Sequence, residues 1–348
     1  MSAGAVVGVV GNDVPRQLPL AAAVLPVRLT GSWDGPVDAQ AQELLGAADL
    51  ETVRILTELR AGAAPVDGLI VCNDSQAHLR LFYVLRATAP RMPLHLLDLP
   101  REDSAPARDF ARGRLRSLLE FCEEVSGRAA DAASLAEAAE AERALGAQLD
   151  RLRAARRADP PSSTGTAAIG AWLQAVRLPP AEAAAVVAAA CVSAEQDAAS
   201  TSALRVHLTG SNHPDASVYR ELEAHGLVIV SEDHDTGDGA WIGAAASGDA
   251  DQVVDELVTA HFARVGGSAT ALSAQRADRT VQVAREAGAE VVGAFIRELD
   301  DAPRWDLADQ SRALETIGLR LHARVGVAVD ARTAAAELAA ALRGGHDR

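Results

Sequence analysis

Short apolar runs rich in Val, Ile and Leu recur along the chain, and most are followed by a turn and a longer segment with helical periodicity. The first run, residues 6–10, stops at Gly11-Asn12-Asp13-Val14-Pro15, and residues 67–72 and 94–97 form two more. Runs of this length are typical of strands buried on both faces of a parallel sheet. The first third of the chain therefore predicts a βαβαβ arrangement.

A second block of the same kind follows a long helical stretch. Its apolar runs are residues 204–209, 227–230, 291–296 and 319–325, and residues 332–343 predict a final Ala-rich helix. The blocks resemble each other, because Gly11, Asn12 and Pro15 follow one first strand as Gly210, Asn212 and Pro214 follow the other.

The fold predicted from this pattern is α/β, with two Rossmann-like parallel-sheet domains joined by a helical connector. The expected boundaries are residues 1–104 for the first α/β domain, 105–199 for the helical connector and 200–348 for the second α/β domain. Ligands of such folds bind at the carboxyl ends of the strands, so we expect a cleft between the domains there. The expected lining is Asn12, Cys72, Asp98, Ser211, Glu232 and Arg297.

Charge and hydropathy exclude several partners. The formal net charge of -15 opposes binding to nucleic acid or to anionic lipid. No run of about 18 uncharged apolar residues occurs, and no basic region precedes the first apolar run, so we expect no membrane association and a cytoplasmic location.

Catalytic motifs that need lysine are excluded, because the sequence contains no Lys. Walker A loops, pyridoxal-phosphate lysines and Schiff-base aldolases are therefore ruled out. No G-x-G-x-x-G follows a strand, and neither G-x-S-x-G nor H-E-x-x-H occurs. The three cysteines are Cys72, Cys122 and Cys191, and no two of them are close enough in sequence to form a C-x-x-C motif. This spacing argues against a zinc ribbon or a disulfide framework.

The densest polar cluster, residues 231–238, directly follows the apolar run 227–230. Its carboxylates and His234 could exchange protons or bind a metal, together with Asp13, Asp74 and Asp98 from the first block. A solvated acidic loop is the alternative. A separate, basic cluster runs from Arg151 to Arg157. Its arginines could bind phosphates or form a solvated helix face, and their spacing around the helix favours the solvated face.

Taken in order, several segments resemble the D-component family of 2-hydroxyacyl-CoA dehydratases and benzoyl-CoA reductases. The segments are Val7-Gly8-Val9-Val10 through Pro15, Pro26-Val27-Arg28-Leu29, Val66-Asp67-Gly68-Leu69-Ile70-Val71 with Asp74-Ser75, Leu97-Asp98-Leu99-Pro100-Arg101, Gly210-Ser211, Glu232-Asp233-His234-Asp235-Thr236-Gly237, Asp300-Asp301-Ala302-Pro303 and Arg332-Thr333. The resemblance implies two α/β domains that hold an acyl-CoA thioester, in a complex of two related subunits. It also implies a cysteine-bound [4Fe-4S] cluster that passes an electron to the thioester carbonyl.

This sequence departs from the family at the cluster. The family's cysteines correspond to Asn73, Asp235 and, by approximate register, Leu299, and Cys72 lies one position from the first of them. A cubane cluster normally needs three or four thiolates, so we expect no cluster and no other cofactor, with a coenzyme A ester as the candidate ligand.

Three functions remain open from the sequence. The first is a cluster-free subunit that binds an acyl-CoA thioester or supports a cluster-bearing partner, which would be a related subunit or a second copy. The second is a non-radical lyase or hydrolase that uses polar residues or a metal in the cleft. The third is a ligand-free structural or regulatory paralogue.

The sequence also predicts which residues form the site. The candidate catalytic residues are Asp74, His234 and Asp235. The candidate ligand-binding residues are Arg16, Arg28, Asn73, Ser211 and Asn212.

Overall fold

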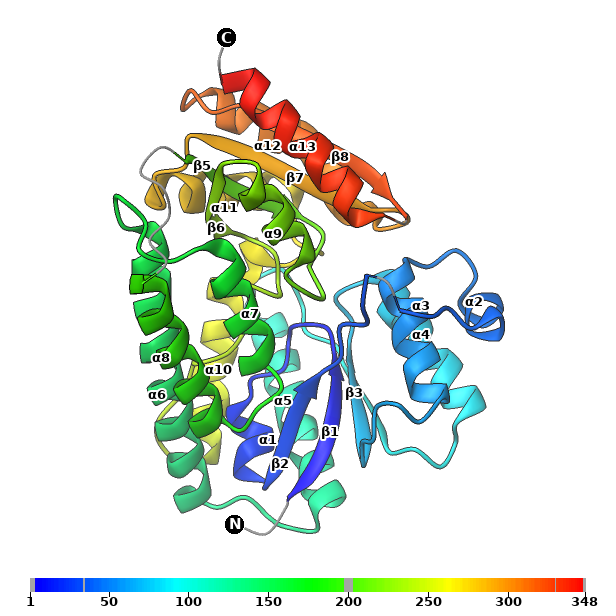
Figure 1. Cartoon of the computed structure of the whole chain (residues 1–348). Helices are drawn as coiled ribbons and strands as arrows, with labels where there is room; N and C mark the ends of the chain where they lie inside the picture. Colours follow the sequence, from blue (N-terminus) through cyan, green and yellow to red (C-terminus); the bar gives the residue numbers. More distant parts are fainter. Residues whose placement is uncertain (1–3, 34, 197–202, 329, 347–348) are drawn as a thin grey trace.

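The strands form two four-stranded parallel sheets of the same topology in a computed structural model that describes residues 4–33, 35–196, 203–328 and 330–346 (Figure 1). The first sheet has the order β2-β1-β3-β4 and the second β6-β5-β7-β8. The strands are β1 (Ala5–Val10), β2 (Val24–Arg28), β3 (Gly68–Cys72), β4 (Leu94–Leu97), β5 (Leu204–Gly210), β6 (Leu227–Glu232), β7 (Val291–Arg297) and β8 (Leu321–Val327). The prediction of an α/β fold with two parallel sheets is confirmed.

Strand β2 is the one strand of the described chain that the apolar pattern did not predict. It is short and contains Pro26, which cannot donate a backbone hydrogen bond. β2 lies at the edge of its sheet and pairs only with β1 within that sheet, and an edge strand tolerates a proline.

Helices cover both faces of the first sheet, because successive strand residues point to opposite sides. Val10, Leu69 and Val71 pack on one face against α2 (Ala39–Leu45), α3 (Leu50–Arg60) and α4 (Gln76–Thr88). Val9 and Ile70 pack on the other face against a second group of helices. That group includes α1 (Gln17–Ala21), α5 (Ala105–Ser126) and α10 (Ala250–Arg264).

The segment expected as a connector forms four helices: α5, α6 (Ala132–Arg157), α7 (Gly165–Ala175) and α8 (Pro180–Gln196). Side chains of Ser104, Asp131 and Thr164 cap the starts of α5, α6 and α7. These helices are shared between the sheets, because α5 packs on the first sheet whereas Ile169 and Leu173 of α7 join the core of the second.

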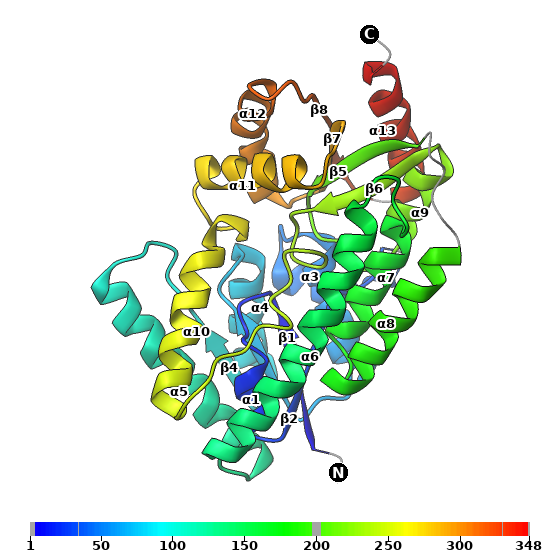
Figure 2. The ribbon, with the colours of Figure 1, turned by 90° about the vertical axis from the view of Figure 1, so that its left-hand side faces the viewer.

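The second sheet is covered by α9 (Ser217–Ala224) and α13 (Ala331–His346) on one face and by α11 (Ser273–Glu286) and α12 (Asp301–Glu315) on the other. Between β6 and β7 the chain leaves this sheet, because Val253, Val254 and Leu257 of α10 pack in the core of the first sheet beside α5 (Figure 2). The short helix η1 (Val265–Gly267) then leads back to α11. We call the first sheet with α1 to α5 and α10 the first lobe, and the second sheet with α7, α9 and α11 to α13 the second lobe.

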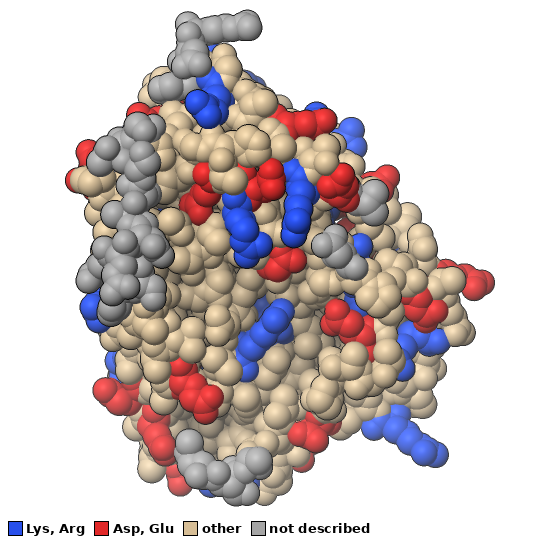
Figure 3. All heavy atoms as spheres, in the orientation of Figure 1, with Lys and Arg blue, Asp and Glu red and all other residues tan. Residues whose placement is uncertain are grey.

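Charged side chains of both signs are interspersed over the face drawn in Figure 3, without a continuous basic surface on that face. None of the helices in the described ranges is long and apolar enough to cross a membrane.

Candidate functional site

The carboxyl ends of strands from both lobes meet at one cavity, which we call the interlobe cavity. Gly11 directly follows β1 and Gly210 is the last residue of β5, with φ of 97° and 111°, a conformation that favours glycine. The cavity has a volume of about 70 Å³. Its lining residues are Asn12, Asp13, Asp49, Glu51, Asp74, Ser75, His78, Gly210, Ser211, Asn212, His234, Asp235, Arg264, Gly267, Ser268, Ala269, Arg276, Arg297, Asp300 and Pro303.

One wall of the cavity is built around Asp74, which follows β3. The Asn12 backbone N–H donates to its Oδ2 at 2.7 Å, and His78 Nδ1 lies 2.6 Å from its Oδ1. His78 stands on the first turn of α4, whose N-cap is Ser75. Burial would lower the pKa of His78, but the adjacent Asp74 carboxylate raises that pKa to about 9. His78 is therefore a cation at neutral pH.

Glu51 connects the two lobes across the cavity. It lies in the first turn of α3, and Arg297 at the end of β7 donates to its Oε2 at 2.7 Å. Asp300 and Asp49 lie 3.6 and 3.8 Å from the same guanidinium nitrogen, so three carboxylates share one cation. Burial raises the pKa of Glu51 to about 7, although Arg297 lowers it. Glu51 can therefore gain or lose a proton near neutral pH.

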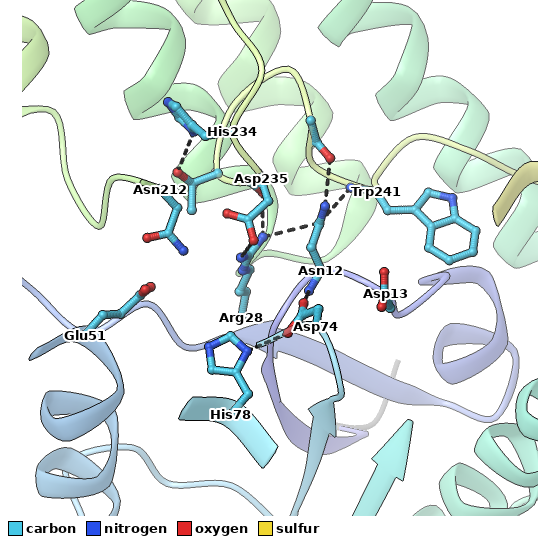
Figure 4. A network of polar contacts seen from close by, with 12 residues as sticks. Asn12, Asp13, Arg28, Glu51, Asp74, His78, Asn212, His234, Asp235 and Trp241 are labelled. Atoms are coloured by element: carbon cyan, nitrogen blue, oxygen red, sulfur yellow. Dashed lines mark hydrogen bonds and ion pairs between the residues drawn. The ribbon is translucent and has the colours of Figure 1, made fainter. Parts of the chain in front are cut away.

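Arg28 and Asn12 form a second interlobe contact (Figure 4). Arg28 donates to the Asp235 backbone carbonyl at 2.6 Å and to its carboxylate at 2.7 Å. The Asn12 side chain donates to the Gly239 carbonyl and accepts from the Trp241 N–H. Burial would raise the pKa of Asp235, but Arg28 holds it below its usual range. Asp235 is therefore a carboxylate paired with Arg28.

The second-lobe wall consists of polar groups that contact each other. His234 Nε2 lies 2.6 Å from the Tyr219 hydroxyl, and its Nδ1 lies 3.1 Å from Thr236 Oγ1. Burial lowers the pKa of His234. The ring of His234 is therefore neutral at pH 7, and both of its nitrogens have a hydrogen-bond partner.

Ser211 and Asn212 of the same wall contact charged side chains. The Ser211 hydroxyl donates to Asp300 at 2.5 Å, and Arg297 donates to both the backbone and the side-chain oxygen of Asn212.

The structure brings together five of the eight candidate residues. Asp74, Ser211, Asn212, His234 and Asp235 line the interlobe cavity. Arg28 lies beside it, through its ion pair with Asp235.

Arg16 and Asn73 do not line this cavity. Arg16 is buried and donates to the carbonyls of Ala175 and Leu178. Asn73 donates to Asp98, which is not a lining residue either. Both side chains are engaged in contacts within the protein.

The solvated-face interpretation of Arg151 to Arg157 is wrong for Arg156. Its side chain is 1% exposed and pairs with Glu232 at 2.6 Å and Asp238 at 2.8 Å. Sequence spacing could not reveal this, because the pattern does not show that β6 packs against this turn of α6. Glu232, expected at the cleft, is likewise fully buried in this pair.

The most important residue that the sequence did not single out is Glu51. Its only local signal is an acidic residue in the first turn of a helix, which also occurs on solvated surfaces. Its contact with Arg297 joins residues separated by 246 positions, so no local pattern could reveal it.

One family model matches the chain. It describes the 2-hydroxyglutaryl-CoA dehydratase D-component, and the match covers residues 12–296. The chain belongs to this family. A comparison with curated proteins finds no match. The match extends from Asn12 into β7, so it includes strands of both parallel sheets, β2 to β7, and most of the residues that line the interlobe cavity. The D-component of this family is a component of a dehydratase.

The residues present in this D-component-like chain do not fit a cysteine-bound cluster. Cys72 and Cys122 lie in one apolar core and Cys191 in another. Burial raises the pKa of Cys72 and raises that of Cys122 to about 12, so both remain thiols. Among the described residues, no three His, Cys, Asp or Glu side chains are arranged to hold a metal ion.

Proposed function

We propose that this chain is a cluster-free subunit of a dehydratase-like complex, which binds an acyl-CoA thioester between its lobes beside a cluster-bearing partner. The observation that carries the proposal is the composition of the interlobe cavity. Asp235 lines it, and Asn73 and Leu299 each directly precede a lining residue, Asp74 or Asp300. These are the positions at which the resemblance places cluster thiolates, and here they carry a carboxylate, an amide and an aliphatic group.

The charges of the cavity support a role in binding rather than in electron transfer. Asp235 is paired with Arg28, and Asp74 with His78. The Ser211 hydroxyl and the Asn212 side chain also lie on the lining, where an acyl group with polar substituents could contact them. The small volume restricts the cavity itself to a short acyl group.

Isothermal titration calorimetry with a panel of short acyl-CoA esters tests the binding role. We expect heat of binding for at least one ester, and a loss of roughly tenfold in affinity in Asn212→Ala, which removes one lining side chain. Glu43→Gln on the exposed face of α2 is the matched control. If none of the esters gives heat, the binding role is refuted, and the ligand-free paralogue is the remaining interpretation.

Iron and sulfide analysis tests the cluster-free part of the proposal. Protein purified without oxygen should contain less than one iron per chain, because the thiolate set is missing. Four irons with matching sulfide would contradict it.

Sedimentation of the protein alone, and together with a cysteine-bearing homologue, tests the partner role. A chain that stays monomeric in both samples would refute that role.

A specific observation also favours a second candidate, a non-radical lyase or hydrolase. Glu51, with a pKa raised to about 7, and His78, with a pKa raised to about 9, line the same cavity. A group near neutrality and a neighbouring cation can accept and donate protons during an elimination or a hydrolysis. Hydrolysis would release a free thiol, and elimination would consume the hydroxyacyl-CoA. Either activity, if it is equal with and without oxygen and is abolished in Glu51→Gln, would favour this candidate.

A further inference from the structure

Residues 29–33, which we call the strap, follow β2 of the first sheet and reach into the second lobe. Arg54 of α3 donates to the Ser32 carbonyl at 2.8 Å, so the strap is attached to the first lobe one residue before its end. The last residue of the strap, Trp33, packs in the second-lobe core and is 5% exposed. The strap therefore connects the lobes through the buried side chain of Trp33.

Trp33 contacts three side chains of the second lobe. Its ring centre lies 5.9 Å from that of His213 and 5.6 Å from that of Phe295. The Arg297 guanidinium lies 5.9 Å from the centre of the same Trp33 ring. Arg297 lines the interlobe cavity, and His213 directly follows the lining residue Asn212. The position of Trp33 is therefore linked to one wall of the cavity.

His213 is buried without hydrogen bonds to its ring. The side chain is 0% exposed and packs against the rings of Trp33, Tyr219, His234 and Phe295. Among the residues that the structure describes, neither Nδ1 nor Nε2 of His213 has a hydrogen-bond partner. A neutral imidazole carries one N–H donor and one acceptor nitrogen, so two polar groups stay unsatisfied while Trp33 is docked. Unsatisfied buried groups lower the stability of the docked arrangement.

The surroundings of His213 also disfavour a positive charge on its ring. Burial, His234 on the loop after β6 and Arg297 at the end of β7 all lower the pKa of His213 well below its usual range. The strap contributes the uncharged Trp33 ring, and α9 contributes Tyr219, whose hydroxyl lies 2.6 Å from His234 Nε2. Within the described part of the chain, a proton on His213 would therefore have no counter-ion.

We propose that Trp33 is a pH-controlled anchor between the lobes, docked while His213 is neutral and released when His213 takes up a proton from solvent. A charged imidazole needs water or a counter-ion, and water reaches it once Trp33 leaves the core. In the released state the pKa of His213 returns to about 6.5. The docked state is therefore favoured above pH 6.5 and is progressively lost as the pH falls below that value.

Release of Trp33 changes the wall of the interlobe cavity. Arg297 loses the Trp33 ring and keeps its ion pair with Glu51 as its contact with the first lobe. The cavity is then held less tightly between the lobes, so ligands enter it more readily in mildly acidic solution than at neutral pH. This control operates on the protein alone and is independent of the ligand that the cavity binds.

Exchange of indole N–H protons with solvent, followed by NMR, measures the release. The chain has four tryptophans, and Trp33→Phe identifies the Trp33 signal. Trp33 Nε1 is buried and has no partner among the described residues, so its proton exchanges when the ring leaves the core. The exposed Trp305 gives the reference rate in the same sample. Trp172 on α7 is buried in another core and likewise lacks a described partner, so it detects opening elsewhere.

Between pH 7.5 and pH 5.5, the Trp33 rate relative to Trp305 should rise about tenfold more in the wild type than in His213→Phe. Protonation of a released His213 with a pKa of about 6.5 multiplies the released population by about 1.1 at the higher pH and about 11 at the lower. Phe keeps an aromatic ring at this position but cannot take up a proton. Glu51 and His234 are present in both proteins, so their titration cancels in the comparison.

Two further variants keep the test decisive. His213→Leu also cannot take up a proton and should lose the same tenfold rise, with circular dichroism to confirm folding. His225→Phe, at the exposed end of α9, is the matched control and should respond as the wild type does. Equal pH dependence at Trp33 in the wild type and both His213 variants would overturn the inference. An equal rise at Trp172 that depends on His213 would also overturn it, because the whole protein would then be opening.

Discussion

Asp74 determines the charge of one cavity wall through two hydrogen bonds. One oxygen accepts from the Asn12 backbone and the other from His78. A buried imidazole would otherwise be neutral, because burial disfavours its charged form. The single carboxylate therefore keeps a cation inside the protein.

Asp74→Asn should destabilise the fold in a pH-dependent way. The folded-state pKa of His78 is raised from 6.5 to about 9, so the pair contributes stability that is complete below pH 6.5 and is lost as the pH rises through 9. We expect Asp74→Asn to lower the free energy of unfolding by about 3 kcal/mol at pH 6, and by less at pH 9.5. Urea unfolding at both pH values measures the difference, with Asp98→Asn as the control. An equal loss at both pH values would contradict the charged pair.

Glu51 should show the effect of a carboxyl group whose pKa is raised on folding. Its contribution to stability is complete below its ordinary pKa of 4.5 and is lost as the pH rises through 7. Glu51→Gln removes this loss, so the variant should gain stability relative to the wild type between pH 5 and pH 8, on the order of 2 kcal/mol. Denaturant unfolding across this range measures it, with Glu43→Gln as the control. A stability difference that does not vary with pH would show that Glu51 does not titrate there.

At the scale of elements, one buried ion pair joins α6 to β6. Arg156 is the largest fully buried side chain in the described chain, and it contacts Glu232 on β6 and Asp238 on the following loop. Buried charges are costly unless each is paired, so removing one partner leaves the others uncompensated.

Arg156→Ala should therefore lower the free energy of unfolding by about 3–5 kcal/mol. Arg151→Ala, on an exposed position of the same helix, should change it by no more than about 0.5 kcal/mol. Thermal unfolding of both variants measures the contrast. Similar small effects in the two variants would restore the interpretation of this run as a solvated face.

At the scale of the whole molecule, buried contacts join the two lobes. Glu51 reaches Arg297 and Arg28 reaches Asp235. Trp33 of the first half of the chain packs in the second-lobe core, with its ring 5.6 Å from that of Phe295. These contacts surround the interlobe cavity, so the shape of the cavity depends on how the lobes are held.

Asn12→Ala should loosen the lobes without unfolding either one. It removes the side-chain bonds to Gly239 and Trp241 on the loop after β6. We expect faster proteolytic cleavage in residues 233–247 and a larger radius of gyration by small-angle X-ray scattering, with a stability loss of about 1–3 kcal/mol. Asn73→Ala, whose side chain contacts Asp98 within the first lobe, is the control. Identical proteolysis of both variants would show that Asn12 does not join the lobes.

The order of strands and helices was readable from the sequence, because apolar runs and helical periodicity are local properties. Seven of the eight described strands lie where these runs predict them, and both Gly-Asn turns end a first strand. The missed strand, β2, has a weak local signal, since Pro26 is tolerated only at a sheet edge, and the edge is a property of the whole sheet.

Which side chains meet was decided only by the tertiary structure. The sequence placed Asp74, Ser211 and Asp235 at strand ends, and parallel strands bring such ends together. It could not indicate that Glu51 faces Arg297, that Arg156 is buried, or that α10 returns to the first lobe. These outcomes depend on packing between segments far apart in the chain. Burial and neighbouring charge set the pKa of a side chain, and neither is defined until that packing has formed.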